Sequence, residues 1–301
     1  MEMFFSDPAV ITLVLITFFA ATVNGALGYG FSSLTVPVAL LFYANRVLNP
    51  ALVLLEVIIN SYVLVMNRRS LPQVWRRVLP MLIGLVPGVV IGSYALAVVH
   101  PGWIKFFTYT IILPFILIQA AGFRRYIKAE RAVSVPFGAG VGVLYSITTI
   151  SGPPLALLFN NQGYVKEEFR AGLALVRITE SSLTALAYYF LGLYSSTTPQ
   201  LMGLIVPSVI LGVPLGIALL RRVAAETFRR FCMSFDAWVV GFGLSRILIE
   251  LGVLASPQAY SVLAATFVID GWLLFRYFGK VGKKRAPVLA APSPSTTEYA
   301  S

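Results

Sequence analysis

The chain has 301 residues, of which 58% are hydrophobic and 12% are charged. A soluble domain carries about 25% charged residues, so this composition excludes an ordinary soluble domain and indicates a membrane protein. The formal net charge of +11 does not indicate nucleic-acid binding, because the basic residues lie in short clusters between apolar runs, as the orientation signals of membrane proteins do.

The first predicted element is an apolar stretch at 8–44 that is interrupted by a glycine-rich segment at 24–30. At about 1.5 Å per residue the stretch is too long for one span, so it predicts a helical hairpin or a pair of half-helices. We expect no cleavable signal peptide, because the N-terminus is acidic and this apolar run is too long. Membrane spans are then predicted at about 50–66, 78–99 and 103–122.

A second broken apolar segment lies at 133–161, with Ser151, Gly152, Pro153 and Pro154 at its centre. A helix cannot run smoothly through two consecutive prolines, and a bilayer tolerates the break only where protein or a water-filled cavity satisfies the freed backbone groups. The half-helix that starts there would point its N–H groups and positive dipole end into that cavity, which favours an anion. A proline kink without a ligand is the alternative. Further spans are predicted at about 170–194, 200–220, 228–250 and 258–277.

The two halves of the chain resemble each other. The hexapeptide that begins at Pro154 repeats the one that begins at Pro37 with a single change, and each follows a break. Two interrupted apolar segments at matching places in two halves indicate the binding site of a transporter. Residues 124 positions apart match further: Gly88 and Gly212, Gly92 and Gly216, Lys105 and Arg229, Phe107 and Phe231, and Glu56 and Glu180.

Four basic clusters decide how the halves are related, since the loops near 195–200 and 251–258 contain no Lys or Arg. The clusters are Arg68, Arg69, Arg76 and Arg77; Arg124, Arg125, Lys128 and Arg131; Arg221, Arg222, Arg229 and Arg230; and Arg276, Lys280, Lys283, Lys284 and Arg285. If each broken segment enters and leaves on one side, all four clusters lie in the cytoplasm. If each spans the membrane once, the third cluster lies opposite the first two.

We therefore predict an all-α polytopic membrane protein with two inverted repeats. Each repeat has a broken or hairpin first helix plus three spans, and one extra C-terminal span follows. The predicted boundaries are 1–123 for the first repeat, 124–132 for a cytoplasmic linker, 133–250 for the second repeat, 251–278 for the extra span and 279–301 for a disordered cytoplasmic tail.

Ionisable residues at membrane depth are expensive and so are candidates for function. Arg177 and Glu180 lie three residues apart, close enough to pair on one helix face. Either they only neutralise each other, or Arg177 binds an anion and releases Glu180 to take a proton. Glu56 has no basic residue nearby in its span, and a buried carboxyl without a partner readily holds a proton. Glu56 is therefore the first candidate for a proton carrier, against a hydrogen-bonded structural carboxyl. Arg246 and Glu250 are expected to pair.

Short polar residues beside the breaks are candidate substrate-binding groups. They either hydrogen-bond an oxyanion or stabilise loose backbone ends, and the sequence does not separate the two. With Arg177, the candidates are Asn24, Tyr29, Ser32, Thr148, Thr149, Ser151 and Gly152. The only histidine, His100, lies in a loop, and Cys232 is the only cysteine, so we expect no enzyme, no metal site and no cofactor.

Around the second break the chain resembles the second-half signature of the TauE/SafE family of sulfite-exporter-like permeases. The matching residues are Ser151-Gly152-Pro153-Pro154-Leu155-Ala156-Leu157, Gln162-Gly163 and Lys166-Glu167-Glu168-Phe169-Arg170-Ala171. The first glycine-rich motif is matched by Gly25, Gly28, Gly30 and Pro37, so the resemblance covers nearly all of 8–278.

This resemblance implies an inner-membrane permease for a small sulfur-containing anion such as sulfite or an organosulfonate. We expect alternating access coupled to protons. The expected partners are the anion, protons and the lipid bilayer, with no nucleic acid. The direction of transport and the oligomeric state, a homodimer included, stay open. The alternatives are an anion channel or uncoupled pore, and a scaffold protein without a substrate.

Overall fold

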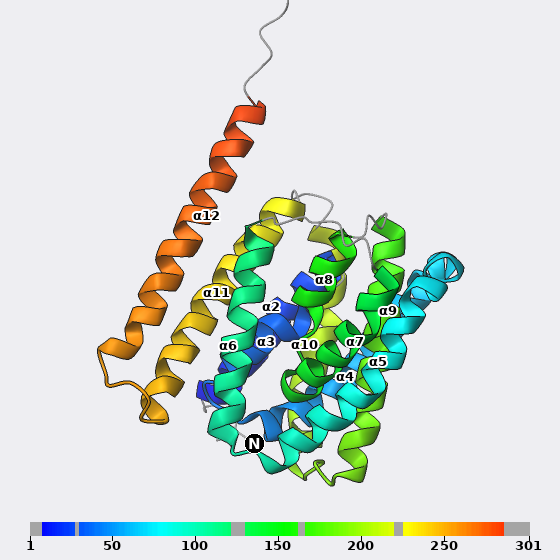
Figure 1. The fold of residues 1–301 in the computed structure, drawn as a ribbon, viewed down its shortest axis with the longest axis horizontal. Coiled ribbons are helices and arrows are strands. Elements are labelled where there is room, and N and C mark those ends of the chain that lie inside the picture. Colours follow the sequence, from blue (N-terminus) through cyan, green and yellow to red (C-terminus); the bar gives the residue numbers. More distant parts are fainter. Residues whose placement is uncertain (1–7, 28–29, 122–129, 162–165, 220–224, 286–301) are drawn as a thin grey trace, which may run out of the picture.

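The structure is a computed structural model that describes residues 8–27, 30–121, 130–161, 166–219 and 225–285. Within these ranges the chain forms helices and no strand (Figure 1), which confirms the prediction of an all-α fold. The helices are α2 (Pro8–Leu27), α3 (Phe31–Ala39), α4 (Asn45–Met66), α5 (Leu71–Val98), α6 (Pro101–Ala120), α7 (Glu130–Thr148), α8 (Gly152–Asn161), α9 (Lys166–Phe190), α10 (Thr197–Leu219), α11 (Ala225–Glu250) and α12 (Ser261–Arg285), with 3-10 turns η1 (Arg68–Ser70) and η2 (Gln258–Tyr260).

Seven segments in the described part of the chain are long and apolar enough to cross a membrane. They are Pro8–Ala26, Asn45–Met66, Arg68–Val98, Pro101–Ala120, Thr197–Gly216, Arg230–Glu250 and Gln258–Gly279. These segments confirm a multi-pass membrane protein. The predicted span at 170–194 corresponds to α9, which is 25 residues long but is not among the seven. Its middle carries Arg177 and Glu180, and both side chains are buried inside the bundle.

Each broken segment folds back on itself as a helical hairpin. α3 packs against α2, and Val38 near the end of α3 lines the same groove as Thr12 in the second turn of α2. Phe159 near the end of α8 and Phe137 near the start of α7 share one core cluster. The second helix of each hairpin therefore returns toward the start of the first.

The two hairpins enter the bundle from opposite ends (Figure 1). The first returns to the start of α6, where Lys105 Nζ donates to the carbonyl oxygen of Leu40 at 2.7 Å. The second returns to the start of α5, since Phe159 belongs to the same core cluster as Val78. Because α6 begins where α5 ends, the hairpins are inverted relative to each other, as the prediction of inverted halves requires.

Glycines join each hairpin to the opposite half of the chain. Gly88 in α5 lies against the backbone of α7, where an added Cβ would be 2.1 Å from the carbonyl oxygen of Ala139. Its repeat mate, Gly212 in α10, lies against α2, where an added Cβ would be 2.8 Å from the carbonyl oxygen of Phe18. Small residues let helix backbones approach this closely. The matched glycines of the two halves therefore perform the same packing task on exchanged partners.

Arg46 and Arg246 lie at the end of the bundle where α5 ends. Seven other described arginines lie at the opposite end, where α5 begins, which we call the basic end. They are Arg68, Arg69, Arg76, Arg77, Arg170, Arg230 and Arg276. Much of the second and third predicted clusters, and most of the linker at 124–132, lie outside the described residues. α12 continues to Arg285, beyond the predicted start of the tail at 279.

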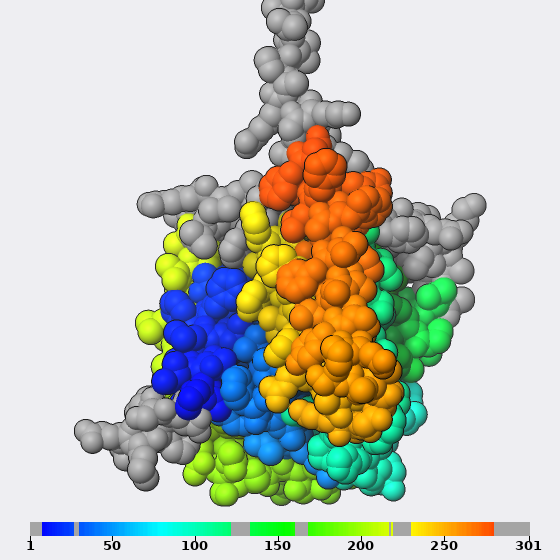
Figure 2. All heavy atoms as spheres, turned by 90° about the vertical axis from the view of Figure 1, so that its left-hand side faces the viewer, coloured from blue at the N-terminus to red at the C-terminus, as the bar shows by residue number. Residues whose placement is uncertain are grey.

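The extra span, α12, lies along α11 on one face of the bundle (Figure 2). Large apolar side chains such as Val268 and Phe275 are exposed on it, as expected of a helix that faces lipid. A buried ion pair holds it in place, with Arg230 Nη2 of α11 3.0 Å from Asp270 Oδ1. The Arg230–Asp270 pair was not predicted, whereas the predicted pair of Arg246 with Glu250 is confirmed at 3.7 Å between exposed side chains.

Candidate functional site

The two breaks have backbone conformations that end a helix. Gly30 precedes α3 with φ 109°, a left-handed conformation that glycine adopts without steric cost. Thr149 precedes α8 with φ 57°, a conformation that a β-branched residue rarely adopts. The second break therefore stores backbone strain, which is typical of functional sites.

Side chains from α4 and α9 bind the carbonyl groups left free at the end of α7. Asn49 Nδ2 donates to the carbonyl oxygen of Ile147 at 2.7 Å, and Asn45 Nδ2 donates to the same oxygen at 3.3 Å. The Tyr188 hydroxyl donates to the carbonyl oxygen of Ser146. These three anchors were not predicted. Asn45 and Asn49 lie one helical turn apart at the start of an apolar span, which is the sequence signal that could have revealed them.

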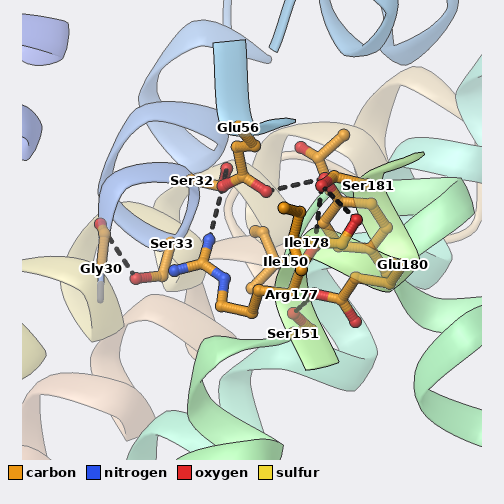
Figure 3. A network of polar contacts seen from close by, with 12 residues as sticks. Gly30, Ser32, Ser33, Glu56, Ile150, Ser151, Arg177, Ile178, Glu180 and Ser181 are labelled. Carbon is orange, nitrogen blue, oxygen red and sulfur yellow. Dashed lines mark hydrogen bonds and ion pairs between the residues drawn. The ribbon is translucent and has the colours of Figure 1, made fainter. Parts of the chain in front are cut away.

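Glu56 on α4 is the centre of a buried polar network (Figure 3). Its Oε1 accepts from the Ser32 hydroxyl of the first break and from Arg177 Nη2 at 2.6 Å. Its Oε2 accepts from the Tyr145 hydroxyl of α7 at 2.7 Å. Glu56 is fully buried and Arg177 is 3% exposed. Glu56 thus accepts from three donors, one of which is cationic.

Glu180, the repeat mate of Glu56, has different surroundings. Its Oε1 accepts from the Ser151 hydroxyl of the second break. Its Oε2 is buried and has no hydrogen-bond partner in the described structure. Each glutamate is thus bonded by a serine from the break of its own half. The Arg177 ion pair, however, joins α9 of the second half to α4 of the first.

Two predictions about these charges are wrong. Arg177 pairs with Glu56 and not with Glu180, so Glu56 does have a basic partner. The pair joins residues 121 positions apart, which the packing of α4 against α9 brings together. A search for a partner within one span cannot find such a contact. Of the two glutamates it is Glu180 that lacks an ion pair among the described residues.

The hydroxyl groups of the two threonines at the second break form hydrogen bonds with the backbone. Thr148 Oγ1 donates to the carbonyl oxygen of Leu144 at 2.7 Å and accepts from the Ile150 N–H at 3.0 Å. Thr149 Oγ1 donates to the neighbouring carbonyl oxygen of Thr148 at 2.7 Å. Both hydroxyl groups therefore stabilise loose backbone at the end of α7.

The remaining candidates lie beside the network. Gly152 is the first residue of α8, and Tyr29 lies outside the described residues. Asn24 is buried near the end of α2, and its Oδ1 has no partner within the described ranges. It lines a groove of about 600 Å³ along α4 that also reaches Asn67 and Arg170 at the basic end. This groove connects the first break with that end of the bundle.

A small cavity of about 20 Å³ lies where the two breaks meet. Gly30 and Ser33 line it from the first break and Pro153 from the second, with Gln119 of α6 and Asp236 of α11. Asp236 is a buried ionisable residue that sequence reasoning did not assign to the site. The described residues contain no group of three His, Cys, Asp or Glu side chains that could hold a metal ion.

The arrangement brings together five predicted residues, Ser32, Glu56, Ser151, Arg177 and Glu180, and adds Tyr145. Sequence reasoning missed Tyr145 because a tyrosine in an apolar span resembles core. A buried guanidinium between two breaks can bind an oxyanion, and two carboxyl groups beside it can hold protons.

Comparison with known proteins gave one family match. The family model described as sulfite exporter TauE/SafE matches residues 13–244. Searches of curated proteins and of solved structures found no match.

Proposed function

The chain belongs to the sulfite exporter TauE/SafE family, and from this membership we propose that it is a secondary transporter which moves a small anion, sulfite or an organosulfonate, by alternating access coupled to protons. We place it in the inner membrane with its basic end in the cytoplasm, in line with the positive-inside rule. The family is one of transporters, which agrees with the expectation that the chain is not an enzyme.

The observation that carries the proposal is Arg177, buried between the two hairpins with its Nε unpartnered among the described residues. A guanidinium has a planar fork of donors that matches an oxyanion, and a charge at this depth is retained only where it is used or neutralised. Glu56 bonds one nitrogen, Nη2, so donor capacity remains for a substrate.

Alternating access is supported by the inverted hairpins that meet at the small cavity. About 20 Å³ is far below the roughly 300–1,000 Å³ of a typical ligand pocket. The cavity between the breaks must therefore widen before it can hold an anion. Hairpins that enter from opposite ends offer such an opening on each side of the membrane in turn.

Transport into proteoliposomes tests the proposal. Labelled sulfite and a panel of organosulfonates are supplied with and without a pH gradient. We expect saturable uptake of at least one anion, accelerated by the gradient. Single-channel currents would instead indicate an anion channel, and the absence of both transport and ligand binding would indicate a scaffold.

The matched variant for this assay is Arg177→Lys, which keeps the positive charge but lacks the planar, forked set of guanidinium donors. A charge-assisted hydrogen bond contributes about 1.5–3 kcal/mol, so the apparent affinity should fall roughly ten- to a hundredfold. Glu250→Gln, which alters an exposed carboxyl, is the control and should transport as the unaltered protein does. Unchanged affinity in Arg177→Lys would remove Arg177 from the binding site.

A further inference from the structure

Glu56 and Glu180, which occupy matching positions in the two repeats, differ in their hydrogen-bond partners. Glu56 accepts three hydrogen bonds, one of them from the Arg177 guanidinium. Glu180 is bonded by Ser151 at one oxygen, and the other oxygen has no partner in the described part of the chain. A cluster of two carboxyl groups and one guanidinium is neutral only if one carboxyl holds a proton, and a buried net charge is costly at membrane depth. Since Arg177 neutralises Glu56, the proton belongs on Glu180.

The other helices that pack against α9 do not change this charge balance. They are α4, α5, α7, α8 and η1. α4 contributes Glu56 and α7 contributes Tyr145, while α8 has no charged residue and the neutral Ser151 just before it bonds Glu180. The charged residues of α5 and η1 lie at the basic end, in the 3-10 turn and the first two turns of the helix: Arg68, Arg69, Arg76 and Arg77.

Two buried groups on α9 are left with unused hydrogen-bonding capacity. They are Arg177 Nε and Glu180 Oε2, which have no partner within the described residues. The two residues are three positions apart and so share one face of the helix. α8 begins at Gly152, next to the serine that bonds Glu180, so the positive end of its dipole lies at the same place. With a proton on Oε2, every one of these groups is a donor, and together they match an oxyanion.

We propose that Arg177 and the protonated Glu180 carboxyl bind the substrate, and that Glu56 is a resident carboxylate which the substrate displaces from Arg177. The ligand is a sulfur oxyanion that accepts from Arg177 Nε–H with one oxygen and from the Glu180 O–H with another. This inference rests on the proposed function, because it takes the ligand to be an anion.

The displacement of Glu56 from Arg177 determines how many protons bind with each anion. When the anion takes Arg177, Glu56 loses its ion pair and remains buried beside Ser32 and Tyr145. The cluster stays neutral if Glu56 takes up one proton from the compartment to which the site is open. One monovalent anion therefore binds together with one proton, and the release of the anion returns the proton and restores the Glu56–Arg177 pair. Glu180 keeps its proton throughout.

Calorimetry on the purified protein tests these roles, with sulfite and methanesulfonate as probes and buffers of different ionisation enthalpy to count protons. We expect the unaltered protein to take up one proton for each monovalent anion bound. Glu56→Gln combined with Glu180→Gln should bind more tightly, because no carboxylate competes for Arg177, and should take up no proton. Glu180→Gln should keep both the affinity and the proton uptake, since the amide also donates. Glu180→Ala should bind roughly tenfold or more weakly, because a hydrogen bond to a charged group is lost.

Infrared difference spectra check the protonation without a ligand and need only folded protein. The C=O stretch of the protonated carboxyl should shift in Ser151→Ala, which removes a hydrogen bond to Glu180, and should stay unchanged in Ser32→Ala, which removes one to Glu56. A shift in Ser32→Ala with none in Ser151→Ala, or loss of proton uptake in Glu180→Gln, would overturn the inference. If the unaltered protein binds neither probe while the infrared result holds, the proposed substrate class fails and the protonation of Glu180 stands.

Discussion

Arg177 shows how much of the buried charge balance depends on a single side chain. Its Nη2 lies 2.6 Å from a carboxylate that is fully buried, with hydroxyl groups as the other donors. A carboxylate in that position tolerates the loss of a hydroxyl better than the loss of its cation.

Removing the guanidinium should therefore destabilise the fold. Arg177→Ala leaves Glu56 as a buried charge without a counter-ion, which costs about 3–5 kcal/mol. Thermal unfolding in detergent should show a clear fall in the midpoint. Arg177→Ala combined with Glu56→Gln should recover most of that stability, because the unpaired charge is gone, but it should not recover anion binding. A double variant that transports as well as the unaltered protein would reduce Arg177 to a structural partner of Glu56.

At the scale of the elements, the seams between α5 and α7 and between α2 and α10 set how closely the two halves fit. In α5 the seam is formed by Gly84, Gly88 and Gly92, each of which lies against the backbone or a side chain of α7. Helices that approach this closely have no room for a methyl group.

Gly88→Ala should accordingly destabilise the bundle, since its Cβ would lie 2.1 Å from a carbonyl oxygen of α7. Overpacking costs about 1–3 kcal/mol. The matched control is Gly140→Ala in α7, where an added Cβ has nothing within 4 Å. That change should be neutral or should stabilise by up to about 1 kcal/mol, because alanine favours the helix. Equal unfolding midpoints for the two variants would contradict the close packing of α5 against α7 at Gly88.

The spans, the breaks and the duplication were predictable because each depends on residues close together in the sequence. Hydropathy marks the spans, consecutive prolines mark the second break, and the Pro37 and Pro154 hexapeptides mark the duplication. The contacts of the site were not predictable, because they depend on which helices become neighbours. Glu56 meets Arg177 because the repeat mates α4 and α9 pack together near the middle of the bundle. The sequence shows that α4 and α9 are matching helices, but only the structure shows that they are neighbours.

For the whole molecule, the position of the basic end gives a test of orientation. Ser196 lies between α9 and α10, at the end of the bundle opposite the basic end, and Gln73 lies in the first turn of α5 at the basic end. Both are exposed.

Single cysteines at these two positions should react differently in whole cells. In a Cys232→Ser background, Ser196→Cys should be labelled by an impermeant thiol reagent, because we expect that end to be outside. Gln73→Cys should be labelled only after the membrane is made permeable. Labelling of both from outside, or of Gln73→Cys alone, would be incompatible with a cytoplasmic basic end.

The exchange of hairpins between halves also bears on how the chain is made. Ser208 Oγ of α10 donates to the carbonyl oxygen of Val14 in α2 at 3.3 Å, across 194 positions of the chain. A ribosome that has completed the first hairpin must synthesise seven more helices, α4 to α10, before the partner of that hairpin emerges. Until then, the small-residue face of α2 that packs against α10 is uncovered in the membrane. The glycine face of α5 is likewise uncovered until α7 has been made. Assembly therefore finishes late. A nascent chain that ends before α10 leaves the insertion machinery with a first hairpin whose partner helix is missing.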